Sequence, residues 1–247
     1  MSWNSVVRHV LERGGYYVRH RSVVPFGVDY FNDIERLAGL WKLPIRIFFD
    51  VGAHCGETSR AALSHFSDAI VFAFEPCSKT FAMLCNVIKG NERFSPHKIA
   101  LSDRLEDAKF FEYECSLYNS LAPNPYAKQS AKVEIVPCTT VDAFCEQHGI
   151  DAIDVLKIDA ERCDLLVLKG AQNMLTLGRI RFVFFEFYTL ADGDGSLWQI
   201  ARRLTSLGFR FVATYIDQFD PDHEFMVANA LFVLPLSGEQ LGSTAPS

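Results

Sequence analysis

Acidic side chains recur where apolar segments of this sequence end, and residues placed in this way could do chemistry together. They are Asp50, Glu75, Asp103, Asp159 and Glu186. If the apolar segments are parallel strands of one sheet, their carboxyl ends meet along one edge, which is where open sheets bind ligands. Carboxylates gathered there could accept hydrogen bonds from hydroxyls or pair with a cation. The spacing therefore predicts a single binding cleft at that edge.

A glycine turn follows the first of these apolar segments. The segment Ile47–Val51 leads into a D-x-G-x-x-x-G turn framed by Gly52 and Gly56. Glycine lets the backbone approach a ligand closely, and the helix expected next offers unpaired N–H groups at its start. A second apolar run, Ala69–Phe74, ends at Glu75. This is the spacing of a βαβ unit in which a carboxylate binds two ribose hydroxyls.

The turn favours one nucleoside ligand over another. A dinucleotide site usually carries G-x-G-x-x-G facing a pyrophosphate, and this turn lacks the first glycine pair. An aspartate at the strand end suits an ammonium instead, so we expect S-adenosylmethionine, with Glu75 at the ribose and Asp103 near the adenine. The candidate cofactor-binding residues are Asp50, Gly52, Ala53, His54, Gly56, Glu75, Pro76, Ser102, Asp103 and Asp159.

The run D-V-L-K-I-D-A-E, residues 154–161, carries the candidate catalytic residues. Lys157, Asp159 and Glu161 alternate along a predicted buried strand, so their side chains share one side. Methyl transfer to a hydroxyl needs a base that removes one proton. Asp159 and Glu161 are the candidates, and Lys157 or Glu186 would orient them. A purely structural ion pair of Lys157 with Asp159 or Glu186 is an equally weighted alternative, because a buried lysine is costly unless it is paired or used.

Metal binding has weak support in the sequence. Asp159, Glu161 and Glu186 could share a divalent cation, since hard cations prefer oxygen ligands. The residues alone do not decide this, and we assign no metal ligands. The seven cysteines show no C-x-x-C spacing, which disfavours a zinc site and indicates reduced thiols in a cytoplasmic protein.

Bulk properties narrow the class of partner. The chain has 247 residues, of which 49% are hydrophobic, enough for one sizeable core. A net charge of −6 disfavours nucleic-acid binding. No apolar run reaches the roughly 18–20 residues that cross a bilayer. We expect no nucleic acid and no membrane span, and a homodimer stays open.

Hydrophobic periodicity places these motifs in one α/β domain. Strand-like and helix-like segments alternate, and two final strand segments follow each other without a helix. We predict a mostly parallel sheet with a closing antiparallel strand. Residues 1–44 form an N-terminal helical appendage that covers a sheet edge or roofs the site, 45–236 form the main domain, and 237–247 form a flexible tail. The irregular segment Glu114–Lys132 is a candidate substrate loop.

The chain resembles the FkbM-type methyltransferases, which use S-adenosylmethionine. The matching motifs, in chain order, are F-D-V-G-A-H-C-G-E-T, F-E-P, I-A-L-S-D, N-S-L, T-T-V-D, L-K-I-D-A-E-R-C-D-L-L-V-L-K-G-A and F-E-F, within residues 45–190. The resemblance implies a Rossmann-like class I methyltransferase fold with seven strands. It also implies a small-molecule or glycan acceptor, methylated on a hydroxyl of a sugar, polyketide, peptide or related metabolite. Our candidate substrate contacts are Asn119, Arg162 and Glu186.

One departure from the family pattern and two other functions remain open. The family usually has glycine after K-I-D-x-E, whereas this chain has Arg162, so the turn is reshaped or the arginine enters the site. The alternative function is a catalytically inactive, methyltransferase-like module that binds a nucleotide or a partner, and Arg162 is its best support. A nicotinamide-dependent oxidoreductase is disfavoured because the turn lacks G-x-G.

Overall fold

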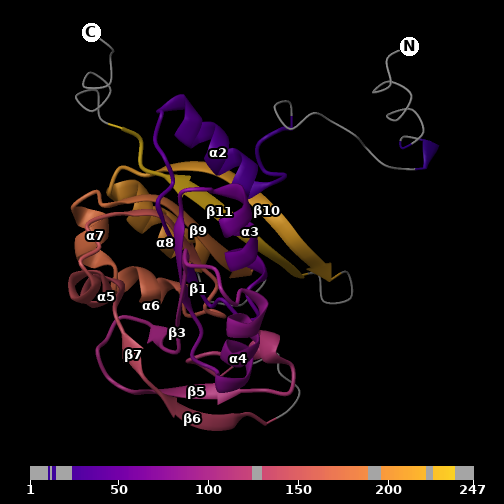
Figure 1. Cartoon of the computed structure of the whole chain (residues 1–247), viewed down its shortest axis with the longest axis vertical. Coiled ribbons are helices and arrows are strands. Elements are labelled where there is room, and N and C mark those ends of the chain that lie inside the picture. Colours follow the sequence, from indigo (N-terminus) through magenta and orange to yellow (C-terminus); the bar gives the residue numbers. More distant parts are fainter. Residues whose placement is uncertain are drawn as a thin grey trace.

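A seven-stranded sheet forms the centre of the protein in this computed structural model (Figure 1). The structure describes Leu11, Arg13, Gly14 and residues 24–123, 130–188, 196–220 and 225–236. Its strands are β1 (Ile47–Val51), β2 (Ile70–Phe74), β3 (Phe94–His97), β8 (Ile153–Ile158), β9 (Ile180–Tyr188), β10 (Arg210–Asp220) and β11 (Phe225–Val233). Most of the first helix of the expected appendage and the tail 237–247 lie outside the described residues, so these boundaries stay predictions.

The strand order is β10-β11-β9-β8-β1-β2-β3. All neighbouring pairs from β9 to β3 are parallel, whereas β11 is antiparallel to both β9 and β10. The expected architecture, a mostly parallel seven-stranded sheet with a closing antiparallel strand, is confirmed. The last strand, β11, lies between β9 and β10. It is antiparallel to β10 because a hairpin, and not a helical crossover, links the two strands.

Helices cover both faces of the sheet (Figure 1). They are α2 (Tyr30–Leu40), α3 (Glu57–His65), α4 (Ser78–Val87), α5 (Val141–His148), α6 (Asp164–Lys169), α7 (Gln172–Thr176) and α8 (Ser196–Ser206). Strand side chains alternate between the two faces. Phe48 joins the core beneath α2 and α3, and Phe49 joins the core beneath α5 to α8. Burial on both faces explains why the central strands are almost continuously apolar.

Helix α2 belongs to the predicted appendage, and it packs into the main core. Its N-terminus is capped by Asp29, which accepts a hydrogen bond from Asn32 N at 3.2 Å. Phe31 and Ile34 are buried in the same hydrophobic cluster as Phe48 of β1. This packing fixes the start of α2 near the carboxyl end of the sheet.

Two small sheets and a short helix complete the fold. The strand pairs are β4 (Ala100–Leu101) with β7 (Cys138–Thr139), and β5 (Ala108–Glu112) with β6 (Lys132–Val136). A 3₁₀ helix, η2 (Ser116–Tyr118), lies in the expected substrate loop. None of the helices among the described residues combines the length and the apolar character that crossing a membrane requires.

Two segments are interrupted by the way the chain packs. Residues 97–101 are divided between two sheets, because β3 ends at His97 in the main sheet and β4 pairs with β7 instead. The helical segment 164–177 is interrupted at Gly170, between α6 and α7. A Cβ at Gly170 would lie 2.0 Å from the carbonyl oxygen of Ser102, so the close approach of these chains requires glycine there.

Candidate functional site

A cavity of about 220 Å³ opens at the carboxyl ends of β1, β2 and β8. Its walls come from the turn after β1, the end of β2, the loops around η2, and the turn after β8. The lining residues include Val51–His54, Phe74–Pro76, Ile99–Leu101, Asn119–Leu121 and Asp159–Glu161. Open α/β sheets bind ligands at this position, so the predicted cleft exists at the predicted edge.

The glycine turn brings the backbone to the floor of this cavity. Gly52 has a φ of +72°, and a Cβ there would lie 1.8 Å from the carbonyl oxygen of Asp159. Only glycine fits, because the turn crosses directly over the end of β8. The N–H groups of Gly52 and Ala53 both donate to the carbonyl of Phe74 at 3.0 Å. Gly56 lies outside the cavity lining. It is the residue before α3, it has a φ of +92°, and it packs against the side chain of Leu84.

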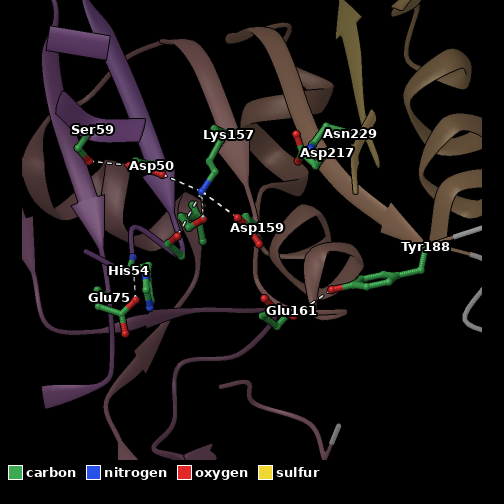
Figure 2. Close-up of polar contacts among 12 residues, drawn as sticks. Asp50, His54, Ser59, Glu75, Lys157, Asp159, Glu161, Tyr188, Asp217 and Asn229 are labelled. Carbon is green, nitrogen blue, oxygen red and sulfur yellow. Dashed lines mark hydrogen bonds and ion pairs between the residues drawn. The ribbon is translucent and has the colours of Figure 1, made fainter. Parts of the chain in front are cut away.

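Glu75 presents a carboxylate that three protein donors hold in one orientation. His54 N donates to Oε2 at 3.0 Å, and Cys77 N and Thr80 Oγ donate to Oε1 at 2.9 and 2.8 Å. Burial raises the pKa of Glu75, and the three hydrogen bonds oppose that shift. Each carboxylate oxygen has two lone pairs, and Oε1 already accepts two hydrogen bonds, so Oε2 retains one lone pair for a hydroxyl in the cavity. Figure 2 shows Glu75 and His54 on one side of the site.

Lys157 is a buried ammonium held between two carboxylates (Figure 2). Strands β1 and β8 place Asp50 and Lys157 opposite each other in register. Nζ of Lys157 lies 3.0 Å from Asp50 Oδ1 and 3.4 Å from Asp159 Oδ2, and it donates to Gly52 O at 3.2 Å. Burial alone would favour the neutral amine, but Asp50 and Asp159 outweigh it and raise the pKa of Lys157. Lys157 therefore stays protonated at neutral pH and can orient Asp159, but it cannot itself accept a proton.

Asp50 does not line the cavity. Its side chain is fully buried, and Ser59 Oγ donates to its Oδ2 at 2.6 Å. The ammonium that it contacts is that of Lys157. Asp159 differs, because 35% of its side chain is exposed and it lines the cavity.

Three carboxylates gather beyond the end of β8. One carboxylate oxygen from each of Asp159, Glu161 and Glu186 lies within 4.8 Å of the other two. Burial and the charge of Asp159 raise the pKa of Glu161 to about 8, and Tyr188 OH donates to its Oε2 at 2.9 Å. Burial, Asp159 and Glu161 also raise the pKa of Glu186. A proton held by this buried pair would relieve the repulsion among the three carboxylates.

The remaining predicted residues differ in their relation to the cavity. Asn119 lines it, while its Oδ1 accepts from Tyr113 N at 2.7 Å and so braces the loop. Ser102 and Asp103 lie just beyond Ile99–Leu101, outside the lining, where Asp103 pairs with Arg104 at 3.3 Å.

The turn after β8 contains two successive residues with positive φ. Glu161 has a φ of +47° and Arg162 a φ of +74°. This left-handed region favours glycine, so the arginine occupies the kind of position that glycine fills without strain. The turn is therefore kept in a glycine-like conformation, and Arg162 itself does not line the cavity.

Several cavity residues were not singled out from the sequence. They are the apolar residues Phe74, Ile99, Leu101 and Phe110 and the polar residues Glu57, Thr58, Ser116 and Ser120. Ser120 Oγ donates to Glu161 O at 2.7 Å, and His54 Nε2 lies 2.8 Å from Ser116 Oγ. The apolar residues look like ordinary strand ends in the sequence, and the serines lie in an irregular loop, so neither carried a signal.

Comparison with known proteins agrees with this geometry. The methyltransferase FkbM domain matches residues 50–211. The 2-O-methyltransferase NoeI of Sinorhizobium fredii (strain NBRC 101917 / NGR234) is 23% identical over 177 residues, 66% of this chain and 72% of that protein. The 31-O-demethyl-FK506 methyltransferase FkbM of Streptomyces tacrolimicus is 26% identical over 204 residues, 71% and 76% of the two chains.

A solved structure supports the fold alone. The METTL16 methyltransferase domain superposes with a TM-score of 0.50 at 11% identity, covering 84% of this chain and 67% of that chain. The matched domain spans the glycine turn, Glu75, the Lys157–Glu161 segment and the sheet that brings them together. The chain therefore belongs to the FkbM family of S-adenosylmethionine-dependent methyltransferases.

Proposed function

We propose that this protein transfers a methyl group from S-adenosylmethionine to a hydroxyl of a sugar, polyketide or related metabolite. Two observations support a hydroxyl oxygen as the atom that accepts the methyl group. Both curated relatives are named as O-methyltransferases. The cavity also brings a carboxylate, Asp159, to the end of β8 where a proton acceptor is needed.

The residues in the cavity fit the cofactor. Three donors hold the carboxylate of Glu75 in one orientation, and Oε2 can accept a hydrogen bond from a ribose hydroxyl. The start of α3, where Glu57 and Thr58 line the cavity, offers backbone N–H groups to the methionine carboxylate. Apolar walls at Ile99, Leu101 and Phe110 suit the adenine ring. When bound, the cofactor supplies a methyl group activated on a sulfonium.

The chain's own part in the reaction is to orient the hydroxyl and to remove its proton. The acceptor oxygen would bond to the methyl carbon as the carbon–sulfur bond breaks and S-adenosylhomocysteine leaves, and its O–H bond would break late in the transition state. Asp159 takes that proton, because it is a partly exposed carboxylate on the cavity wall. Lys157, itself anchored by Asp50, fixes the carboxylate in place. Alignment of the reacting atoms supplies most of the remaining rate enhancement.

Asp159→Asn tests the base assignment. We expect loss of methyl transfer, measured with isotopically labelled S-adenosylmethionine and a panel of glycosides and polyketides, with cofactor affinity retained. The matched control is Asp107→Asn, which changes an exposed aspartate just before β5. Near-normal turnover in Asp159→Asn would remove this residue as the base. Cofactor binding by the wild type without transfer to any acceptor would favour the inactive binding module instead.

A further inference from the structure

A second, larger hollow lies against the same Lys157–Asp159 pair. Its volume is about 510 Å³, and it opens between the start of α2, the start of α3 and the β10–β11 hairpin. Thr58, Lys157 and Asp159 line both this hollow and the cofactor cavity. In Figure 2, Asp217 and Asn229 lie on the side of Asp159 away from Glu75 and His54. The two hollows therefore meet at the carboxylate assigned as the base.

The walls of this second hollow are acidic and rich in hydrogen-bonding groups. Asp29, Asp159 and Asp217 line it, and the amide of Asn229 donates to Asp217 Oδ2. Among its described lining residues the only basic side chain is Lys157. That ammonium already pairs with Asp50 and Asp159. An acceptor with its own negative charge would meet repulsion there.

Aromatic rings form the rest of the wall and are held in fixed positions. Tyr30 stacks on Phe184 with ring centroids 4.0 Å apart, and Tyr215 meets Tyr30 edge-on at 6.0 Å. Tyr215 OH donates to Asp33 Oδ2 at 2.7 Å, and the same oxygen accepts from Gly27 N at 2.8 Å. Asp33 thus ties the turn before α2 to β10, so the hollow is preformed. Flat rings beside carboxylate and amide groups offer an apolar face and hydrogen-bond acceptors to a ring that carries hydroxyls.

We propose that this second hollow is the acceptor subsite, and that it takes a polyhydroxylated ring without negative charge, such as a neutral sugar. Asp217 and Asn229 hold hydroxyls of that ring and set its orientation, while one hydroxyl reaches Asp159. This inference rests on the proposed function, because it places the acceptor beside the base. It adds the location, the charge preference and two specificity-determining residues.

The test uses the full-length protein with S-adenosylhomocysteine bound, so that binding is read without turnover. The probes are methyl β-D-glucopyranoside and its anionic counterpart, methyl β-D-glucuronide. Saturation-transfer NMR should show binding of the neutral glycoside and at least about tenfold weaker binding of the glucuronide. Asp217→Asn should weaken binding of the neutral glycoside about tenfold, as expected for loss of one hydrogen bond to a charged group, and should narrow the difference between the two probes.

Asp217 is exposed, so this substitution does not threaten the fold. Asn229→Ala should have a similar effect on the neutral glycoside, and Asp107→Asn should have none. Three results would overturn the inference: no binding of the neutral glycoside, equal or stronger binding of the glucuronide, or unchanged binding in Asp217→Asn. Binding that responds to Asp217 without methylation by the loaded enzyme would keep the subsite and reject the proposed methyl transfer.

Discussion

Removing the ammonium of Lys157 should destabilise the protein strongly. Lys157 is 5% exposed and Asp50 is fully buried, and their charged atoms are 3.0 Å apart. Lys157→Met would keep the volume of the side chain, but it would leave Asp50 with a hydrogen bond from Ser59 and without the charge of Lys157. Breaking one side of a buried ion pair typically costs about 3–5 kcal/mol. We therefore expect a loss of about 4 kcal/mol in the free energy of unfolding, which lowers Tm by roughly 10 °C in a protein of this size.

A second substitution separates the charge effect from simple repacking. In Lys157→Met, the buried carboxylate of Asp50 has lost its counter-charge. Asp50→Asn removes that carboxylate, so the double variant should be more stable than Lys157→Met alone. Urea unfolding at pH 7 measures both effects. A loss below about 1 kcal/mol, or a double variant no more stable than the single one, would refute the buried-pair reasoning.

Three further outcomes follow from the same site. Arg162→Gly should leave cofactor affinity unchanged, because glycine adopts the φ of +74° without strain and Arg162 does not line the cavity, and a weakened affinity would contradict this. The folded-state pKa of Glu161, about 8, lies above its usual value, so its contribution to stability is present at acidic pH and is lost as pH rises towards 8. Glu161→Gln should flatten that fall in urea titrations across pH 5–8, and an unchanged slope would count against the assignment. Gly52→Ala should abolish cofactor binding, since its Cβ would collide with Asp159 O at 1.8 Å, and a normal affinity would show that the turn can move.

Most of the fold and part of the site could be predicted from local sequence. The turn at Gly52 and the carboxylate at Glu75 stand next to apolar strands, so their place at the sheet edge follows from chain order alone. The register between strands that are far apart in the sequence could not be predicted in this way. Asp50 and Lys157 are far apart in the chain, and only the pairing of β1 with β8 shows that they neutralise each other.

The same limit applies to the breaks in regular structure and to the second hollow. Gly170 lies within an apolar helical pattern. Glycine is required there because the backbone of Ser102 lies against it, and hydrophobic periodicity does not reveal that contact. Asp217 and Asn229 belong to different strands that meet only in the hairpin, so neither carried a signal by itself. Position in three dimensions, and not residue type, gives these side chains their proposed role.

The central claim is that the cavity at the ends of β1, β2 and β8 holds S-adenosylmethionine through Glu75, and calorimetric titration of the cofactor tests it most directly. The wild type should bind with an affinity of about micromolar order. Glu75→Ala should weaken binding by at least about tenfold, since it removes a hydrogen bond to a charged group, worth about 1.5–3 kcal/mol. The exposed Glu106→Ala serves as control and should bind as the wild type does. An unchanged affinity in a folded Glu75→Ala protein would contradict the account.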